Sequence, residues 1–294
     1  MSLPPEIRKK VRWLEISTRK LVNSLFTGSY HSAFKGQGMT FSEFREYVPG
    51  DDVRTISWAL TARTGKVYIK KFDEERELTL MLVVDVSGSL DFGTGSDFKG
   101  EIATHLSALL GFAAQKNNDH VGLLLFSDQV EHFVPPKKGR GHVNRILRDL
   151  YFQKPLHRKT KIAAATQYLQ GVLKKKAIVF VLSDFGDENF AESLKTMSKK
   201  HDVVAIVVDD PAERILPAVG LVDFRDAETD QIVTVDTGSR AFREAFEREM
   251  KKRFEVRERE LRKAGVDRVD VSTNSDFVAP LAAYFKRRSA GGRR

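Results

Sequence analysis

From Leu78 onward, strongly apolar runs alternate with helical segments, and this alternation constrains the fold more than any other feature of the chain. Three of the runs are LMLVVD at 80–85, AIVFVLSD at 177–184 and DVVAIVVDD at 202–210. Each is apolar at consecutive positions, which is typical of strands covered on both faces of a parallel sheet. Helical segments of about 10 to 15 residues between such strands indicate βαβ units. The pattern therefore predicts an α/β fold with a doubly wound, mostly parallel sheet.

The remaining elements of this α/β domain follow from the same periodicities. A further strand is expected at VGLLLFS (121–127), and helices are expected at about 99–116, 143–150 and 162–173. Two alternating runs around a polar turn predict a β-hairpin insertion at 221–236, attached to the sheet. The domain then closes with a charged helix over 239–263 that Gly265 ends, a strand at 266–272, and a helix that Ser275 caps and that runs through Phe285.

The first part of the chain differs in texture and is expected to form an accessory module. Apolar positions at near-helical spacing predict an amphipathic helix over 5–26. Turn signals at Gly36, Gly38 and Pro49-Gly50 precede a β-like run at 66–72. We therefore divide the chain into an N-terminal module over 1–76, the α/β domain over 77–288 and a basic tail over 289–294.

Composition narrows the classes of function. The chain has no cysteine, which excludes disulfides, thiolate zinc sites and cysteine nucleophiles. The net charge of +9 lies at the two ends, with +4 in residues 1–20 and +5 in residues 286–294. Charges come too early for a signal peptide, and no run of about 18 apolar residues predicts a membrane span. We expect a cytoplasmic protein.

Oxygen-bearing side chains gather where strands end. Asp85 closes the first strand, and Ser87 and Ser89 follow it at two-residue steps. Asp184 closes another strand, and Thr160 begins a helix after a basic loop. In an open parallel sheet these positions converge outside the carboxyl ends of the strands. Together they form a hydroxyl-rich oxygen shell, which predicts a site for Mg²⁺, or for Mn²⁺ or Ca²⁺.

The charge balance of this shell indicates what such a site would do. Three hydroxyls and two carboxylates leave a divalent ion short of direct negative ligands and leave one position open. A carboxylate from another molecule can fill that position. The sequence therefore predicts a non-enzymatic adaptor that binds a protein partner through the metal ion.

Two alternatives of other classes stay open. A Mg²⁺-dependent phosphotransfer enzyme would use Asp85 as its nucleophile, although the second acid that such phosphatases need two residues later is replaced by Ser87. Nucleic-acid binding through the basic ends is the weaker alternative, because these ends lack interleaved aromatic residues. The oligomeric state does not follow from the sequence.

Two further motifs are candidates for partner contacts. In PGDDVRTISW, Asp51 or Asp52 is expected to pair with Arg54 or Arg63 and to clamp the N-terminal module to the α/β domain, or else to form a docking surface. In PPKKGRGHVNR, the basic loop of Lys137, Lys138 and Arg140 precedes a helix and could cradle a phosphate, although it has no Walker motif. The favoured expectation is a solvated loop near the metal face, where it could attract acidic residues of a partner.

The oxygen cluster resembles a known metal site. Asp85-Val-Ser87-Gly-Ser89, Thr160 and Asp184 are similar to the metal-ion-dependent adhesion site of von Willebrand factor A domains. The resemblance implies that the serines and the threonine ligate the metal directly or through water, and that the aspartates act largely behind them. Thr160 is followed by Lys161, where that family often has an acidic or amide residue.

A closer resemblance covers most of the chain. The motifs PGDDVR, Trp58, Ala62-Arg63, KKFDEERE, VLSDF and DAETD occur in the order seen in domain-of-unknown-function family 58. Ser57 stands where an aspartate is expected before the tryptophan. Members of that family carry an A domain and are often encoded beside MoxR-type AAA+ ATPases. The resemblance therefore implies an adaptor that works with such an ATPase in complex assembly or maturation.

Overall fold

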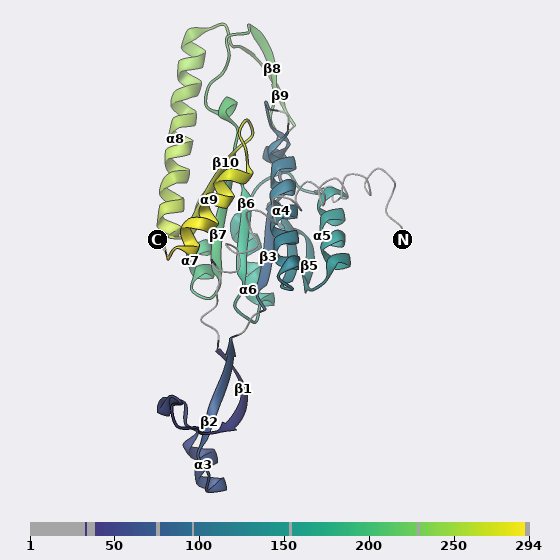
Figure 1. Cartoon of the computed structure of the whole chain (residues 1–294). Coiled ribbons are helices and arrows are strands. Elements are labelled where there is room, and N and C mark those ends of the chain that lie inside the picture. Colours follow the sequence, from purple (N-terminus) through teal and green to yellow (C-terminus); the bar gives the residue numbers. More distant parts are fainter. Residues whose placement is uncertain are drawn as a thin grey trace.

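The computed structural model describes residues 33, 39–74, 77–95, 97–152, 155–227 and 230–291. Its centre is a six-stranded sheet with the order β10-β7-β6-β3-β4-β5 (Figure 1). All neighbours in it are parallel except β4 and β5. The strands are β3 (Thr79–Asp85), β4 (His120–Phe126), β5 (Val130–Lys137), β6 (Ile178–Ser183), β7 (Asp202–Asp209) and β10 (Asp267–Ser272). The predicted α/β fold with a mostly parallel sheet is confirmed.

The central strands are buried on both faces, as their continuous apolar sequences predict. Along β3, Leu80, Leu82 and Val84 belong to one apolar cluster, and Met81 and Val83 belong to the cluster on the other face. Successive side chains of a strand point to opposite faces, so an unbroken apolar run requires a cover on each side. The sheet is therefore the middle layer of three.

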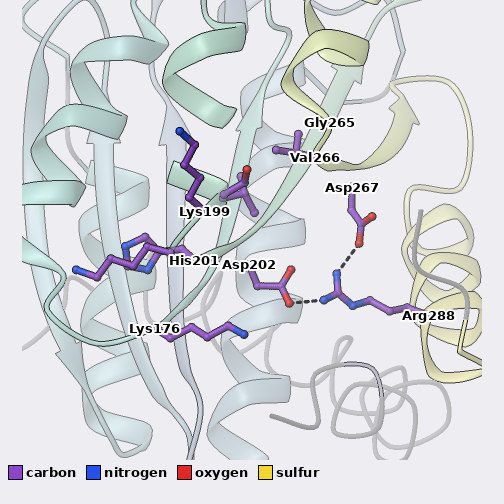
Figure 2. A pocket seen from close by; sticks show the side chains of 11 residues that line it. Lys176, Lys199, His201, Asp202, Gly265, Val266, Asp267 and Arg288 are labelled. Atoms are coloured by element: carbon purple, nitrogen blue, oxygen red, sulfur yellow. Dashed lines mark hydrogen bonds and ion pairs between the residues drawn. The ribbon is translucent and has the colours of Figure 1, made fainter. Parts of the chain in front are cut away.

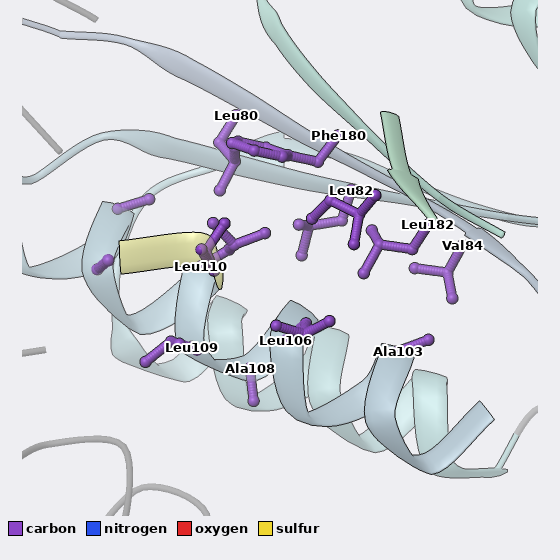
Figure 3. Packing of buried hydrophobic residues seen from close by; sticks show 14 of the residues in the cluster. Leu80, Leu82, Val84, Ala103, Leu106, Ala108, Leu109, Leu110, Phe180 and Leu182 are labelled. Atoms are coloured by element: carbon purple, nitrogen blue, oxygen red, sulfur yellow. The ribbon is translucent and has the colours of Figure 1, made fainter. Parts of the chain in front are cut away.

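Helices supply the two outer layers. One face is covered by α4 (Lys99–Lys116), α5 (Arg140–Phe152) and α9 (Val278–Ser289), and the other by α6 (Ile162–Val172), α7 (Ala191–Ser198) and the end of α8 (Arg240–Ala264). Figure 3 shows Leu106 and Leu110 of α4 packed toward the strands. Burying one leucine fully contributes about 1.5–3 kcal/mol, so this layer fixes the sheet firmly. Within the described ranges, no helix has both the length and the apolar character needed to cross a bilayer.

The N-terminal part forms a small unit of its own. β1 (Met39–Glu46) pairs antiparallel with β2 (Tyr68–Glu74), and the segment between them holds η2 (Val53–Thr55) and α3 (Trp58–Thr64). The expected β-like run is thus confirmed by β2. Figure 1 shows this unit projecting from the body near the start of β3. The amphipathic helix predicted over 5–26 lies outside the described residues.

The predicted hairpin exists, but it does not join the sheet. β8 (Leu221–Arg225) and β9 (Ile232–Asp236) pair only with each other, as a separate two-stranded sheet. The expectation of attachment was wrong because most side chains of both strands are exposed, so neither strand offers a face to a core. The helix after it begins at the predicted cap, where the Ser239 hydroxyl accepts from the Phe242 amide, and ends at Gly265 in the left-handed conformation.

Strand β5 corrects the position of the basic loop. Pro135 and Pro136 hid this strand in the sequence, although proline is tolerated on a sheet edge. Because β5 runs antiparallel, it carries the chain back so that Lys137 lies opposite Val121, near the start of β4. The basic loop therefore lies at the amino edge of the sheet, at the end opposite Asp85, and not near the metal face.

Within the α/β domain, α7 and α9 also differ from the prediction. α7, a short helix of eight residues, was not predicted. For α9, Ser275 is not the cap: the Asp276 carboxylate accepts from the Val278 amide at 2.8 Å. A carboxylate two residues before the helix serves the same purpose as a serine cap, because it satisfies an amide that has no partner within the helix.

Candidate metal-binding site

The candidate site lies where the winding of the sheet reverses. From β3 the chain adds β4 and β5 on one side, and it adds β6, β7 and β10 on the other. Ligands of open α/β sheets collect at such a switch point, outside the carboxyl ends of the strands. Asp85 is the last residue of β3, and Asp184 follows β6 directly. The fold thus brings these two predicted residues to the expected place.

Asp85 is held rigidly at the end of its strand. Its Oδ1 accepts from the Ser87 amide at 2.9 Å, and its Oδ2 accepts from the Ser183 hydroxyl at 2.6 Å. The residue is only 1% exposed. Ser183 was not singled out from the sequence, although it ends the neighbouring strand. With both oxygens engaged, Asp85 shapes the loop that carries the serines.

The two serine hydroxyls converge. Ser87 Oγ and Ser89 Oγ lie 3.1 Å apart. The hydroxyl of Ser89 also hydrogen-bonds the Asp184 carboxylate. Ser87 is buried, whereas Ser89 is half-buried. The D-x-S-x-S spacing therefore aims its oxygens at one point, with one hydroxyl closer to solvent.

Thr160 lies in a loop that is fastened to the same place. The carbonyl of Arg158 accepts from the Gly88 amide at 2.9 Å, and the Lys161 amide donates to the carbonyl of Ser127, which follows β4, at 2.9 Å. Thr160 lies between these two anchors and is half-buried. Within the described part of the chain its hydroxyl forms no hydrogen bond, so it remains available to a ligand.

A buried lysine that was missed in the sequence completes the site. Lys99 Nζ donates to Asp184 Oδ2 at 2.8 Å and also to Glu213 Oε1, and the side chain is fully buried. Lys99 is the first residue of α4, where the helix dipole disfavours a cation. A lysine at that position of an apolar helix was the signal that could have revealed it.

The buried groups carry a surplus of negative charge. Asp184 and Glu213 share a single ammonium, that of Lys99, and Asp85 lies buried beside Asp184. Burial and the nearby Asp184 carboxylate raise the pKa of Asp85 to about 7. Burial alone would raise the pKa of Asp184 too, but Lys99 outweighs it and holds that pKa below its usual value. Lys99 thus neutralises Asp184 and leaves Asp85 without a counter-charge.

The donor set fits a hard divalent cation. In the described residues no group of three His, Asp or Glu side chains is placed to hold a metal, so hydroxyls would have to contribute. Ser87, Ser89 and Thr160 supply such hydroxyls, and Asp85 and Asp184 supply negative charge behind them. Mg²⁺ accepts mixed oxygen ligands and retains water readily. A bound cation would also remove the repulsion that raises the pKa of Asp85.

The tip of the β8–β9 hairpin reaches this site. A Cβ added at Gly88 would lie 2.1 Å from the carbonyl oxygen of Ala227. Arg158 Nη1 donates to the same carbonyl at 3.4 Å and to Asp230 Oδ1 at 3.1 Å. Only glycine therefore fits between the two predicted serines while the hairpin holds this position.

The acidic motif of the N-terminal unit forms local ion pairs. Asp51 pairs with Arg45 at 2.8 Å, and Asp52 pairs with Arg54 at 3.0 Å. Of the expected pairs, the one between Asp52 and Arg54 is present. All four residues belong to the N-terminal unit, so these pairs stabilise its turn and do not clamp it to the α/β domain. The docking surface stays a prediction.

At the amino edge, a pocket of about 430 Å³ lies at the starts of β7 and β10 (Figure 2). Arg288 closes it by pairing with Asp202 and, at 2.5 Å, with Asp267. Arg288 was counted in the basic C-terminal end, but its side chain is only 8% exposed.

The predicted basic loop lies at the amino edge as well. Its Lys138 pairs with Glu77 at 2.5 Å. Lys137 and Arg140 flank it at this same edge.

Comparison with known proteins gives the family. Residues 43–256 match the family described as "Protein of unknown function DUF58". The chain belongs to this family. A relative, an uncharacterized protein of Mycobacterium tuberculosis, is 30% identical over 290 residues, covering 98% of this chain and 91% of its own length. Another, from Mycobacterium avium, is 27% identical over 54% of this chain and 95% of its own length.

Solved structures resemble this DUF58 chain more distantly. BatB from Bacteroides thetaiotaomicron is 16% identical, covers 73% of this chain and 100% of its own, and gives a TM-score of 0.46. The VWA domain of SpRpn10 is 13% identical, covers 70% of this chain and 93% of its own, and gives a TM-score of 0.39.

Proposed function

We propose that this DUF58 protein is a metal-dependent adaptor that binds an acidic residue of a protein partner through a divalent cation at the carboxyl edge of its sheet. The residues that would hold the cation are Ser87, Ser89 and Thr160, with Asp85 and Asp184 behind them. The cation would supply a Lewis-acidic position for the partner's carboxylate. The protein's own residues hold the loops that carry these hydroxyls.

The surplus buried negative charge is the observation that carries this proposal. Asp184 and the half-buried Glu213 share one ammonium, and the buried Asp85 beside them has the Asp184 carboxylate, not a cation, as its charged neighbour. Such an arrangement is costly unless a cation compensates it. The hydroxyls at the rim add ligands without adding charge, so a bound Mg²⁺ or Mn²⁺ would keep affinity for one more carboxylate.

The partner is proposed from the family resemblance. Members of this family are often encoded beside MoxR-type AAA+ ATPases, and we infer that such an ATPase supplies the acidic residue. The exposed basic residues of the loop before α6, Lys159 and Lys161, support an acidic partner, because they would attract it to this edge.

The geometry favours this adaptor over a phosphotransfer enzyme. A nucleophilic carboxylate needs an oxygen that can reach a phosphorus atom from solvent. Both oxygens of Asp85 are already hydrogen-bonded, and the residue is 1% exposed. No acid follows at the second position, where Ser87 stands.

The experiment compares two double variants. Ser87→Ala with Ser89→Ala should keep the fold but abolish Mn²⁺ binding in a calorimetric titration, and with it the Mn²⁺-dependent retention of a purified MoxR-type ATPase. The matched control is Ser275→Ala with Ser289→Ala, which removes two exposed hydroxyls that bond only local carbonyls. Retention that persists in EDTA, or Mn²⁺ binding that survives without the two serines, would refute the proposal.

A further inference from the structure

The hairpin tip covers one side of the candidate metal site. The carbonyl oxygen of Ala227 occupies the space that a side chain at Gly88 would need. Gly88 itself stands in the sequence between Ser87 and Ser89, which carry the candidate ligands. Arg158, whose carbonyl accepts from the Gly88 amide, donates its guanidinium to Ala227 and Asp230. A partner that approaches Ser89 from this side would therefore meet the hairpin first.

The hairpin is held at its base and is otherwise weakly supported. At the base, Thr237 donates through its amide at 2.8 Å and through its hydroxyl at 2.7 Å to the carbonyl of Gly220. Beyond that point β8 and β9 pair only with each other, and most of their side chains are exposed. A two-stranded hairpin without a packed face is marginally stable. The tip can therefore leave its place at a small energetic cost while the base stays fixed.

The face under the tip is suited to an acidic turn. Arg158 binds both a backbone carbonyl and a carboxylate of the hairpin, which are the groups that an acidic turn presents. Its neighbours Lys159 and Lys161 are exposed and form no ion pair within the described ranges. Asp230 itself is shared between Arg158 and Arg225, the latter at 2.6 Å. Lys159 and Lys161 thus stand beside the Arg158 ion pair as two further cations that an acidic turn could meet.

We propose that the tip of the β8–β9 hairpin occupies the partner's place on this face, and that the partner presents an acidic turn which displaces it. The inference rests on the proposed function, because the partner's acid would then complete the metal site beside Gly88. The hairpin is an internal competitor: while its tip lies on Gly88 and Arg158, the partner-binding face is closed.

Gly88→Ala tests this directly, because its methyl group would collide with the backbone of Ala227 and force the tip away. Asp230→Asn is a second variant, which weakens the ion pairs of the tip without a steric change near the serines. Gly171→Ala is the matched control, since nothing lies within 4 Å of a Cβ added there. In both test variants, amide hydrogen exchange should become faster in peptides covering 219–236 and unchanged in α4 and β6.

The binding probe is a synthetic peptide that copies residues 221–236, with an otherwise identical peptide in which amides replace the acids as its control. If the wild-type face is open about a tenth of the time, Asp230→Asn should bind the acidic peptide about tenfold more tightly in Mn²⁺, whereas Gly88→Ala should gain no affinity, because its methyl group would meet the peptide's turn as it meets Ala227. Unchanged hairpin exchange in both variants, or unchanged peptide affinity of Asp230→Asn despite faster exchange, would overturn the inference. Tighter binding that is equal in EDTA would instead refute the metal-dependent function and leave the covered face standing.

Discussion

The two edges of the sheet handle buried charge in opposite ways. At the amino edge, the Arg288 guanidinium is paired with Asp202 and Asp267, and lysines surround the pocket. At the carboxyl edge, the Lys99 ammonium forms ion pairs with Asp184 and Glu213 and leaves Asp85 without a cation. The buried guanidinium at the amino edge is paired with carboxylates, whereas the carboxyl edge keeps a buried carboxylate that a cation would stabilise. This difference, more than the shape of either edge, locates the candidate binding site.

The largest effect is expected from removing the single buried ammonium. Lys99→Met should lower the free energy of unfolding by about 4 kcal/mol in EDTA, because it leaves the buried Asp184 and the half-buried Glu213 without their counter-charge. Urea unfolding measures this change. Mg²⁺ should restore part of the loss, since a bound cation would replace the missing charge.

The control is Lys195→Met, which removes a lysine from an exposed i,i+3 pair and should change stability by at most about 0.5 kcal/mol. Equal losses in the two variants would show that Lys99 compensates no buried charge.

The second prediction concerns pH. The pKa of Asp85 is raised to about 7 in the folded protein, whereas an unfolded aspartate titrates near 4. Between these values the folded state binds the extra proton, so stability in EDTA should fall as pH rises, by on the order of 3 kcal/mol. Urea unfolding at pH 5 and pH 8 measures the slope, and Asp85→Asn or saturating Mg²⁺ should flatten it. A wild-type slope unaffected by both would contradict the assignment.

A smaller loss is expected at the amino edge. Arg288→Ala should cost about 2 kcal/mol, because Asp202 and Asp267 remain partly accessible to water once their partner is removed. Thermal or urea unfolding with and without Mg²⁺ should give the same loss. A Mg²⁺-dependent loss would mean that the two edges are not independent.

The smallest effect concerns the exposed charge beside Thr160. Lys161→Glu should tighten Mn²⁺ binding about twofold at low salt, since an exposed charge is strongly screened by water. Calorimetric titration at two ionic strengths measures it, and the gain should vanish at high salt. Lys174→Glu, on an exposed lysine after α6, is the control and should leave the affinity unchanged.

The sheet could be predicted from the sequence because buried parallel strands have a distinctive pattern of consecutive apolar residues. Continuous apolar runs identified β3, β6 and β7, and the spacing after β3 identified α4 at its observed bounds. Strand β5 escaped because its prolines and polar residues resemble a loop, and only pairing with β4 makes it a strand. An edge strand forms because it pairs with a neighbouring strand, and the local periodicity of its own sequence carries no information about that pairing.

For the candidate site, the side chains that end strands were predictable and those brought in by packing were not. Asp85 and Asp184 follow strands of one sheet, so topology alone sets them side by side. Lys99 comes from the start of a helix and Glu213 from the short helix η4 (Pro211–Glu213) after β7. The hairpin tip could not be placed either, because its contact with Gly88 joins segments that no sequence pattern links.

The outer strands of the sheet also bear on how this protein behaves in a crowded solution. Pro135 and Pro136 lack an N–H, so a foreign strand laid along β5 would find fewer donors there than a regular edge strand offers. On the far side, β10 carries Arg268 and Asp270, which are bonded to each other at 2.7 Å. Both edge strands, β5 and β10, therefore disfavour the addition of a strand from another chain, and with it self-association through the sheet edges.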